Sequence, residues 1–157
     1  GVEVSRTLTD TRRISPVDEV IAYYAVSSFA NSRGQQVTYS NAISAKATAY
    51  VPDAKWGHQT ASGKRARAGV IAVDPNVIPL GTKVYVKSED PAFGDYGFAI
   101  AWDTGGSIKG NIIDLFMERE SLSLAYSWGL RPVTIYILDD QSIDVFALRH
   151  GDEVFIS

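Results

Sequence analysis

Three aspartates lie where short apolar segments meet turns, and carboxylates in such places can transfer protons or hold a fold together. Asp74 follows the apolar run GVIAV, Asp103 follows FAIAW, and Asp114 lies inside NIIDLF. Moving an unpaired ionised carboxylate out of water is costly. We therefore expect Asp114 to be paired, to line a cleft, or to be held in its protonated form.

Two of these aspartates also have a plain structural explanation, because they stand beside turn residues. Asp74 precedes Pro75 and can initiate a turn. Asp103 precedes Thr104 and a pair of glycines, so its side chain can bond to the backbone of its own turn. A structural role is therefore open for both.

Asp114 is harder to explain as a turn residue. Alternation along a strand would point its side chain away from Ile113 and Leu115 and onto the face of Phe116. The structural alternative is a carboxylate at a sheet edge that pairs with Lys109 or with an arginine. Both explanations remain open on the sequence alone.

The elements that must position these aspartates are predicted to be short strands. From Ala45 onward, apolar and polar residues alternate in short runs that glycine and proline interrupt. Such texture is typical of a small β-barrel or sandwich. Ser121 to Trp128 is the one helix predicted within this region, with Gly129 as its left-handed C-terminal residue. The six predicted strands are KATAYV, GVIAVD, TKVYVK, YGFAIAWD, NIIDLF and PVTIYIL.

The two ends of the chain are predicted to differ from this central region. Ser15 and Pro16 read as the start of a helix, and apolar residues follow at helical spacing from Val17 to Phe29. We expect residues 1–43 to form a helical arm, 44–138 a barrel, and 139–157 a hairpin that turns at His150-Gly151-Asp152. The arm would be either a flap on the barrel or the means of a homodimer, formed by exchange of the N-terminal helix.

Composition excludes several classes of protein. The 157 residues are 45% hydrophobic and 21% charged, which fits one globular domain, and the formal net charge of −3 gives no basic footprint for nucleic acid. With no cysteine and two histidines, neither a disulfide nor a metal site is expected. No apolar run approaches the ~20 residues that span a bilayer. No signal peptide stands before Gly1, so an exported protein would carry its targeting segment outside this sequence.

Taken together, the segments resemble a known family. TAYVPDAKWGHQTASG, AGVIAVDPNVIPLGTKVYV, YGFAIAWDTGGSIKGNIIDLFM and WGLRPVTIYIL occur in this order. They resemble the 3D domain, named for its three aspartates, of YuiC-like stationary-phase survival proteins and of the membrane-bound lytic transglycosylase A family. The resemblance spans roughly Ala45 to Leu138, and DTGGSIKG followed by IDLF is its most specific part.

This resemblance implies a mainly β fold, a double-psi β-barrel, and cleavage of peptidoglycan glycan strands without a cofactor. It also implies that the protein is secreted or associated with the cell wall. The family aspartates fall on Asp74, Asp103 and Asp114, and the catalytic acid aligns with Asp114. A lytic transglycosylase protonates the oxygen between N-acetylmuramic acid and N-acetylglucosamine, and the same carboxyl group then takes a proton from the muramic acid 6-hydroxyl. The pKa of that group must rise from about 3.9, at about 1.4 kcal/mol per unit.

Further residues could contact the sugars through stacking, hydrogen bonds or close backbone approach. Aromatic side chains are more often part of a core than of a sugar platform, and we expect this for Tyr50, Trp102, Tyr126 and Trp128, but not for Trp56 in its polar loop. The paired glycines could approach either a sugar or another strand. The candidates for substrate binding are Tyr50, Trp56, Thr60, Thr104, Gly105, Gly106 and Lys109.

Two other functions remain open. An inverting hydrolase uses two carboxylates about 6.5–9.5 Å apart with a water between them, and Asp114 with Asp74 or Asp103 could supply them. A non-catalytic, expansin-like module would bind the wall and keep the aspartates for structure. The product separates the enzymes, because a hydrolase leaves a reducing end and a transglycosylase leaves an anhydro sugar.

Overall fold

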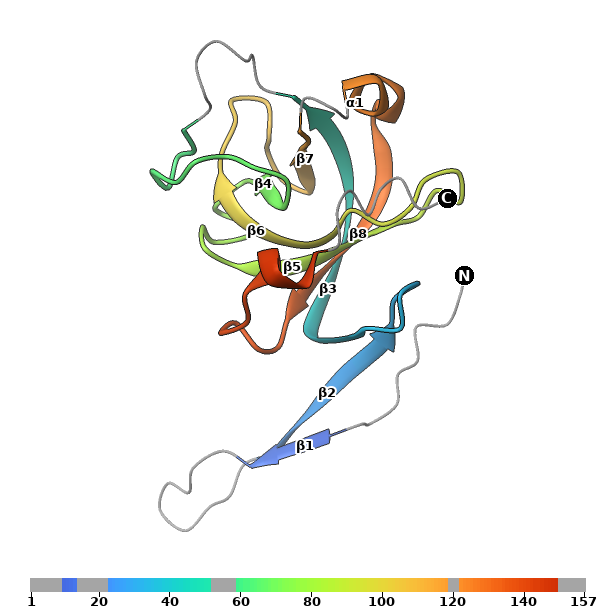
Figure 1. The fold of residues 1–157 in the computed structure, drawn as a ribbon. Coiled ribbons are helices and arrows are strands. Elements are labelled where there is room, and N and C mark those ends of the chain that lie inside the picture. Colours follow the sequence, from blue (N-terminus) through green and yellow to red (C-terminus); the bar gives the residue numbers. More distant parts are fainter. Residues whose placement is uncertain (1–9, 14–22, 52–58, 119–121, 150–157) are drawn as a thin grey trace.

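The computed structural model describes residues 10–13, 23–51, 59–118 and 122–149 (Figure 1). This part of the chain folds mainly into strands, with two short helices. The elements are β1 (Asp10–Arg13), β2 (Tyr23–Ala30), β3 (Gln36–Tyr50), β4 (Val70–Ala72), β5 (Lys83–Ser88), β6 (Gly97–Asp103), β7 (Ile112–Phe116), α1 (Leu122–Trp128), β8 (Arg131–Leu138) and α2 (Val145–Leu148).

Six of the described strands close into a barrel in the order β3-β7-β4-β6-β5-β8, and β8 pairs back onto β3. The pairs β3–β7 and β4–β6 are parallel, and the other pairs are antiparallel. These are the six strands that the alternating pattern predicts, so the mainly β class is confirmed. The double-psi connectivity of the barrel stays a prediction.

The barrel encloses the main apolar core, to which all six strands contribute alternate side chains. α1 follows β7 and places Trp128 in this core, where the indole Nε1 donates a hydrogen bond of 2.9 Å to the carbonyl of Ala47. The helix within the barrel region is thus confirmed. Gly129 ends it with a φ of +63°, a left-handed conformation that favours glycine. The predicted capping residue Ser121 lies outside the described residues.

A second apolar cluster lies on the outer face of the barrel, under β2 and α2. Its centre is aromatic: the ring of Phe29 lies 4.7 Å from that of Tyr136 and 5.5 Å from that of Tyr85, measured between centroids. Edge-on and tilted pairs of this kind add to the energy of burial. The cluster therefore attaches β2 to the barrel wall.

The predicted N-terminal helix is wrong where the structure can test it. Tyr23–Ala30 forms β2, which pairs with β1 and, through Ser27 to Ala30, with β3. The run YYAVSSF is rich in aromatic and small residues that suit a strand, and a short apolar run fits either period. Residues 17–22 of the predicted helix lie outside the described residues. Figure 1 shows β1 and the start of β2 extending away from the barrel.

The predicted C-terminal hairpin is also wrong within the described residues. Instead of a strand, the chain after β8 makes a turn and then α2. The side chain of Asp144 caps this helix by accepting hydrogen bonds from the amides of Phe146 and Ala147, at 3.0 and 3.3 Å. The proposed turn at residues 150–152 lies outside the described residues.

No helix among the described residues is long and apolar enough to cross a membrane. The predicted domain boundary at residue 44 falls inside β3, which is one continuous strand through the N-terminal attachment and the barrel. A register shift against β8 between Tyr39 and Asn41 changes the face that β3 presents, so that Tyr39 joins the outer cluster and Ala45 the barrel core.

Candidate active site

Asp114 lies in the middle of β7, on the outer face of the barrel. Its neighbours Ile113 and Leu115 point into the barrel core, as alternation predicts. β3 runs parallel to β7 and places Thr48 in register with Asp114. The Thr48 hydroxyl donates a hydrogen bond of 2.9 Å to Asp114 Oδ1. The carboxyl group is half-buried, so it is partly shielded from water and still reachable from outside.

Asp103 reaches the same face through an irregularity in β6. Strict alternation would point it into the barrel, because Ala101 belongs to the barrel core. The register with β4 shifts between Ile71 and Ala72, so that Ala72 pairs with Asp103 and Trp102 is the additional residue. A β-bulge re-aims the side chains that follow it. The bulge therefore accounts for the direction of Asp103.

The carboxylate of Asp103 is buried, with 6% of the residue exposed, and three donors hold it. Its Oδ1 accepts hydrogen bonds from the amides of Ala61 and Thr104, at 3.0 and 2.9 Å. Its Oδ2 accepts a hydrogen bond of 3.3 Å from the Tyr50 hydroxyl. Donors of this kind favour the ionised form of a carboxyl group. Asp103 is thus arranged to carry a negative charge.

Asp103 and Asp114 lie on either side of the same residue, because Ala72 in β4 is in register with both. Adjacent strands are about 4.8 Å apart, so the two aspartate backbones are separated by roughly 10 Å. Tyr50 lies two residues beyond Thr48 on β3 and extends toward both carboxylates. Burial raises the pKa of Tyr50 far above its ordinary value, and the charges of Asp103 and Asp114 raise it further. The phenol is therefore a neutral donor to Asp103, within reach of the charge of Asp114.

Asp74 has a different setting. Its Oδ2 accepts a hydrogen bond of 2.8 Å from the amide of Gly110, and its Oδ1 accepts one of 3.0 Å from the amide of Asn76. These two amides, from Gly110 first, hold the pKa of Asp74 below its usual range, and the charge of Lys109 acts in the same direction. Asp74 thus ties the loop before β7 to the end of β4.

The loop between β6 and β7 holds four of the predicted substrate-binding residues. Thr104, Gly106 and Lys109 are exposed. A Cβ atom on Gly105 would lie 2.9 Å from Ile108 Cγ1, so glycine is required there by the protein itself. Gly106 has open space around its Cα, where a ligand could approach. The role of this loop in substrate binding stays a prediction.

The remaining candidates lie apart from this loop. Thr60 is buried, and its hydroxyl donates a hydrogen bond of 2.7 Å to the carbonyl of Lys64 within a tight turn. Trp56 lies outside the described residues. Tyr50 packs edge-on against Phe116, with ring centroids 5.3 Å apart, beside the two aspartates. Of the other aromatic residues, Trp128 is in the core as expected, whereas Tyr126 is 80% exposed.

Sequence reasoning missed three groups that support the aspartates. Thr48 and Tyr50 lie on the same face of β3, which the alternation of KATAYV could have indicated. The parallel pairing of β3 with β7 is what brings Thr48 to Asp114, and the sequence gives no signal for that pairing. The amide of Ala61 comes from a turn that Ser62-Gly63 marks in the sequence, but nothing in the sequence indicates that this turn reaches Asp103. The hydroxyl of Tyr96 accepts a hydrogen bond of 2.8 Å from the amide of Gly69 and donates one to the carbonyl of Phe116. These two bonds join the residue before β4 to the end of β7.

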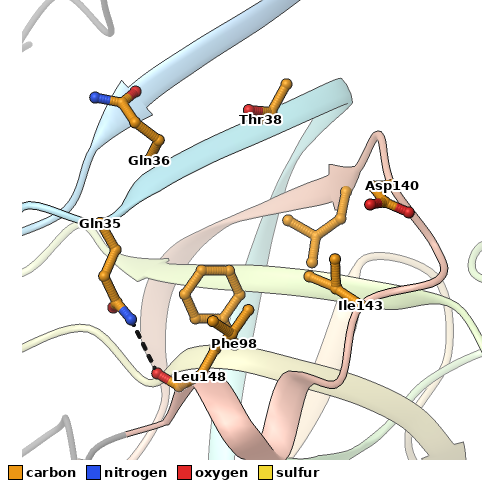
Figure 2. A pocket seen from close by; sticks show the side chains of 8 residues that line it. Gln35, Gln36, Thr38, Phe98, Asp140, Ile143 and Leu148 are labelled. Atoms are coloured by element: carbon orange, nitrogen blue, oxygen red, sulfur yellow. Dashed lines mark hydrogen bonds between the residues drawn. The ribbon is translucent and has the colours of Figure 1, made fainter.

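Several recesses open on the described part of the molecule, and two of them differ in their lining. One, of about 480 Å³, is lined by Trp102 and by charged residues of the segment 64–67. The other, of about 370 Å³, lies between the start of β3 and the segment after β8 (Figure 2). Figure 2 shows Phe98 and Ile143 among its lining residues, and Gln35 donating a hydrogen bond of 3.1 Å to the carbonyl of Leu148. None of the three aspartates lines this second recess.

No group of three or more histidine, aspartate or glutamate side chains that could hold a metal ion is found in the described part of the chain. The chemistry proposed for the site rests on carboxyl groups and hydroxyl donors. Of these groups, the half-buried carboxyl group of Asp114 is suited to proton transfer, whereas the phenol of Tyr50 keeps its proton.

The site thus belongs to a closed β-barrel with an acidic outer face. Residues 69–139 match the model of the 3D domain, so the resemblance seen in the sequence is confirmed. All three aspartates lie inside the matched range.

Relatives with similar sequences are proteins of Bacillus subtilis (strain 168). YabE, whose name refers to cell wall shaping, is 42% identical over 135 residues, which are 82% of this chain and 30% of YabE. The cell wall-binding protein YocH is 45% identical over 114 residues, which are 69% of this chain and 36% of YocH. The chain therefore spans about a third of the length of these relatives.

Among solved structures, MltA from E. coli is 22% identical, with a TM-score of 0.42 over 56% of this chain and 29% of MltA. The lytic transglycosylase LtgG of Burkholderia pseudomallei is 27% identical, with a TM-score of 0.40 over 55% of this chain and 28% of LtgG.

Proposed function

We propose that this domain is a peptidoglycan lytic transglycosylase in which Asp114 acts first as acid and then as base. The observation that carries the proposal is that Thr48 on β3 donates to Asp114 on the neighbouring β7, while Asp103 lies across β4 from Asp114 and accepts from the neutral Tyr50. The 3D domain and the cell wall names of the relatives support peptidoglycan as the substrate. Such a substrate places the protein outside the cytoplasm, secreted or associated with the cell wall.

The two carboxyl groups would hold different protonation states. Asp103 has three donors and is the ionised member. A negative charge there disfavours a second one nearby, which favours the protonated form of Asp114. The Thr48 hydroxyl fixes the orientation of the Asp114 carboxyl group. Asp103 and Asp74 would therefore position and tune the site.

In the reaction, the proton of Asp114 passes to the glycosidic oxygen as the bond from that oxygen to C1 of the muramic acid breaks. The resulting Asp114 carboxylate then takes the proton of the 6-hydroxyl, whose oxygen bonds to C1 and closes the anhydro ring. The carboxyl group is protonated again at the end, and no water is consumed. General acid catalysis of this kind contributes about 10²–10⁴ in rate.

Two other functions stay open to experiment. A two-carboxylate hydrolase would need Asp103 as the base, so Asp103→Asn would abolish activity and leave the melting temperature unchanged. The name of YocH favours a module that only binds the wall.

Incubation of purified peptidoglycan with the protein, followed by chromatography of the glycan strands, tests for an enzyme. Shorter strands in the presence of the protein support the proposal. Strands that sediment with the protein and keep their length would instead support the binding module.

A further inference from the structure

The recess beside Trp102 is cationic, although the chain as a whole carries a net charge of −3. It borders the active site, because Trp102 directly precedes Asp103 in β6. At about 480 Å³ it is large enough for several atoms of a ligand. Its lining residues are Lys64, Arg65, Ala66, Arg67, Trp102 and Glu118.

The charges of the recess do not cancel. Among the described lining residues, three cations face one carboxylate, that of Glu118, which accepts a hydrogen bond of 2.9 Å from the amide of Ala68. Among the described residues, Lys64, Arg65 and Arg67 form no ion pair with a carboxylate. A recess with this excess of positive charge is suited to an anionic ligand.

The walls of the recess are held in place by the rest of the fold. The carbonyl of Lys64 accepts hydrogen bonds from the amide and the hydroxyl of Thr60, at 2.8 and 2.7 Å. The amide of Ser62 donates to the carbonyl of Trp102 at 3.0 Å. Arg67 and Trp102 both pack on Phe146. The guanidinium carbon of Arg67 lies 3.5 Å from the centroid of the Phe146 ring, and the ring centroids of Trp102 and Phe146 are 5.3 Å apart. A pre-formed wall loses little conformational entropy when a ligand binds.

We propose that this recess binds a carboxylate at the lactyl position of muramic acid, either that of the lactyl group or one on the stem peptide attached to it. The domain would thereby select anionic strands. This inference rests on the proposed function, because it takes peptidoglycan as the ligand. A guanidinium group binds a carboxylate through two parallel hydrogen bonds, and the indole of Trp102 offers a flat apolar wall to the adjoining chain. The carboxylate can come from the stem peptide or, on a strand without peptide, from the lactyl group itself.

The test measures binding in an Asp114→Asn background, so that it needs no catalysis. Three probes are used: peptide-bearing glycan strands, strands from which an amidase has removed the peptides, and chitohexaose, which has no carboxylate. The variant Lys64→Gln/Arg65→Gln removes two exposed charges of the recess. Lys87→Gln on β5, whose ammonium lies 3.9 Å from Glu89, is the matched surface control.

We expect the double variant to bind carboxylate-bearing strands about fivefold to tenfold more weakly, as two partly exposed charge contacts would give, and to bind chitohexaose unchanged. The difference should shrink as salt is added. If the double variant loses affinity only for peptide-bearing strands, the recess binds a carboxylate of the stem peptide. If it loses affinity only for stripped strands, the recess binds the lactyl carboxylate.

Equal weakening for chitohexaose, or no weakening for either kind of strand, would overturn the inference. Far-ultraviolet circular dichroism confirms that the double variant is folded. Because binding is read without turnover, a protein that binds strands through this recess and never shortens them would contradict only the proposed enzymatic function.

Discussion

The hydroxyl of Tyr50 donates a hydrogen bond to Oδ2 of Asp103 across 3.3 Å, from a strand that is not adjacent to β6. Burial and the two nearby carboxylates raise the pKa of Tyr50, so the phenol keeps its proton throughout the working range of pH. The contact joins the two halves of the acidic face, since Tyr50 is on β3 beside Asp114 and Asp103 is at the end of β6.

Replacing Tyr50 by phenylalanine would remove this donor and keep the edge-on packing on Phe116. We expect a loss of about 1.5–3 kcal/mol in unfolding free energy, the range for hydrogen bonds to charged groups, together with reduced activity. Urea unfolding and a turnover assay measure the two effects. A variant as stable and as active as the wild type would contradict the account of Tyr50.

Thr48→Val should lower kcat about tenfold with little change in KM, because the side chain keeps its shape but no longer donates to Asp114. Thr48→Ser retains the hydroxyl and is the matched control, expected near wild-type activity. Steady-state kinetics on soluble glycan strands provide the comparison. Equal losses in both variants would assign Thr48 to packing alone.

Asp74→Asn should make stability less dependent on acid pH. The folded-state pKa of Asp74 is lowered, so its charged form contributes stability above the ordinary pKa of about 3.9, and this contribution is lost as the pH falls through the lower, folded-state value. The variant should therefore be less stable than the wild type at pH 7, and the gap should close in strong acid. Chemical unfolding at a series of pH values measures the gap, and a gap independent of pH would contradict the assignment.

The N-terminal arm should mediate a dimer through its strands. The segment predicted to exchange as a helix forms the strand β2 over Tyr23–Ala30. β1 pairs only with β2 among the described strands, which leaves an edge that another chain can extend. Light scattering should give a dimer for the whole chain and a monomer for a chain that starts at Gln35. A monomeric whole chain at micromolar concentration rules the dimer out.

Local pattern was sufficient to predict the six barrel strands and α1, because each strand has one face in the barrel core and most of the runs are followed by a glycine or proline turn. It failed for Tyr23–Ala30, where helical and strand spacing both fit and pairing with β3 decides. It also could not place Asp103, since alternation points this residue inward and only the register shift against β4 turns it out.

The partners of the aspartates were the least predictable part of the site. Thr48 reaches Asp114 through a parallel pairing between strands more than sixty residues apart, and Ala61 reaches Asp103 through a turn. Such contacts depend on the closed order of the barrel strands, which no local run of residues specifies.

Mass spectrometry of muropeptides released from purified peptidoglycan tests the central claim most directly, with the wild type and Asp114→Asn compared side by side. Asparagine keeps the shape of the side chain and removes the transferable proton. The account predicts 1,6-anhydro-muramic acid ends from the wild type and a rate about 10²–10⁴ lower from the variant. Reducing ends from the wild type, or anhydro ends from the variant at a near wild-type rate, would contradict it.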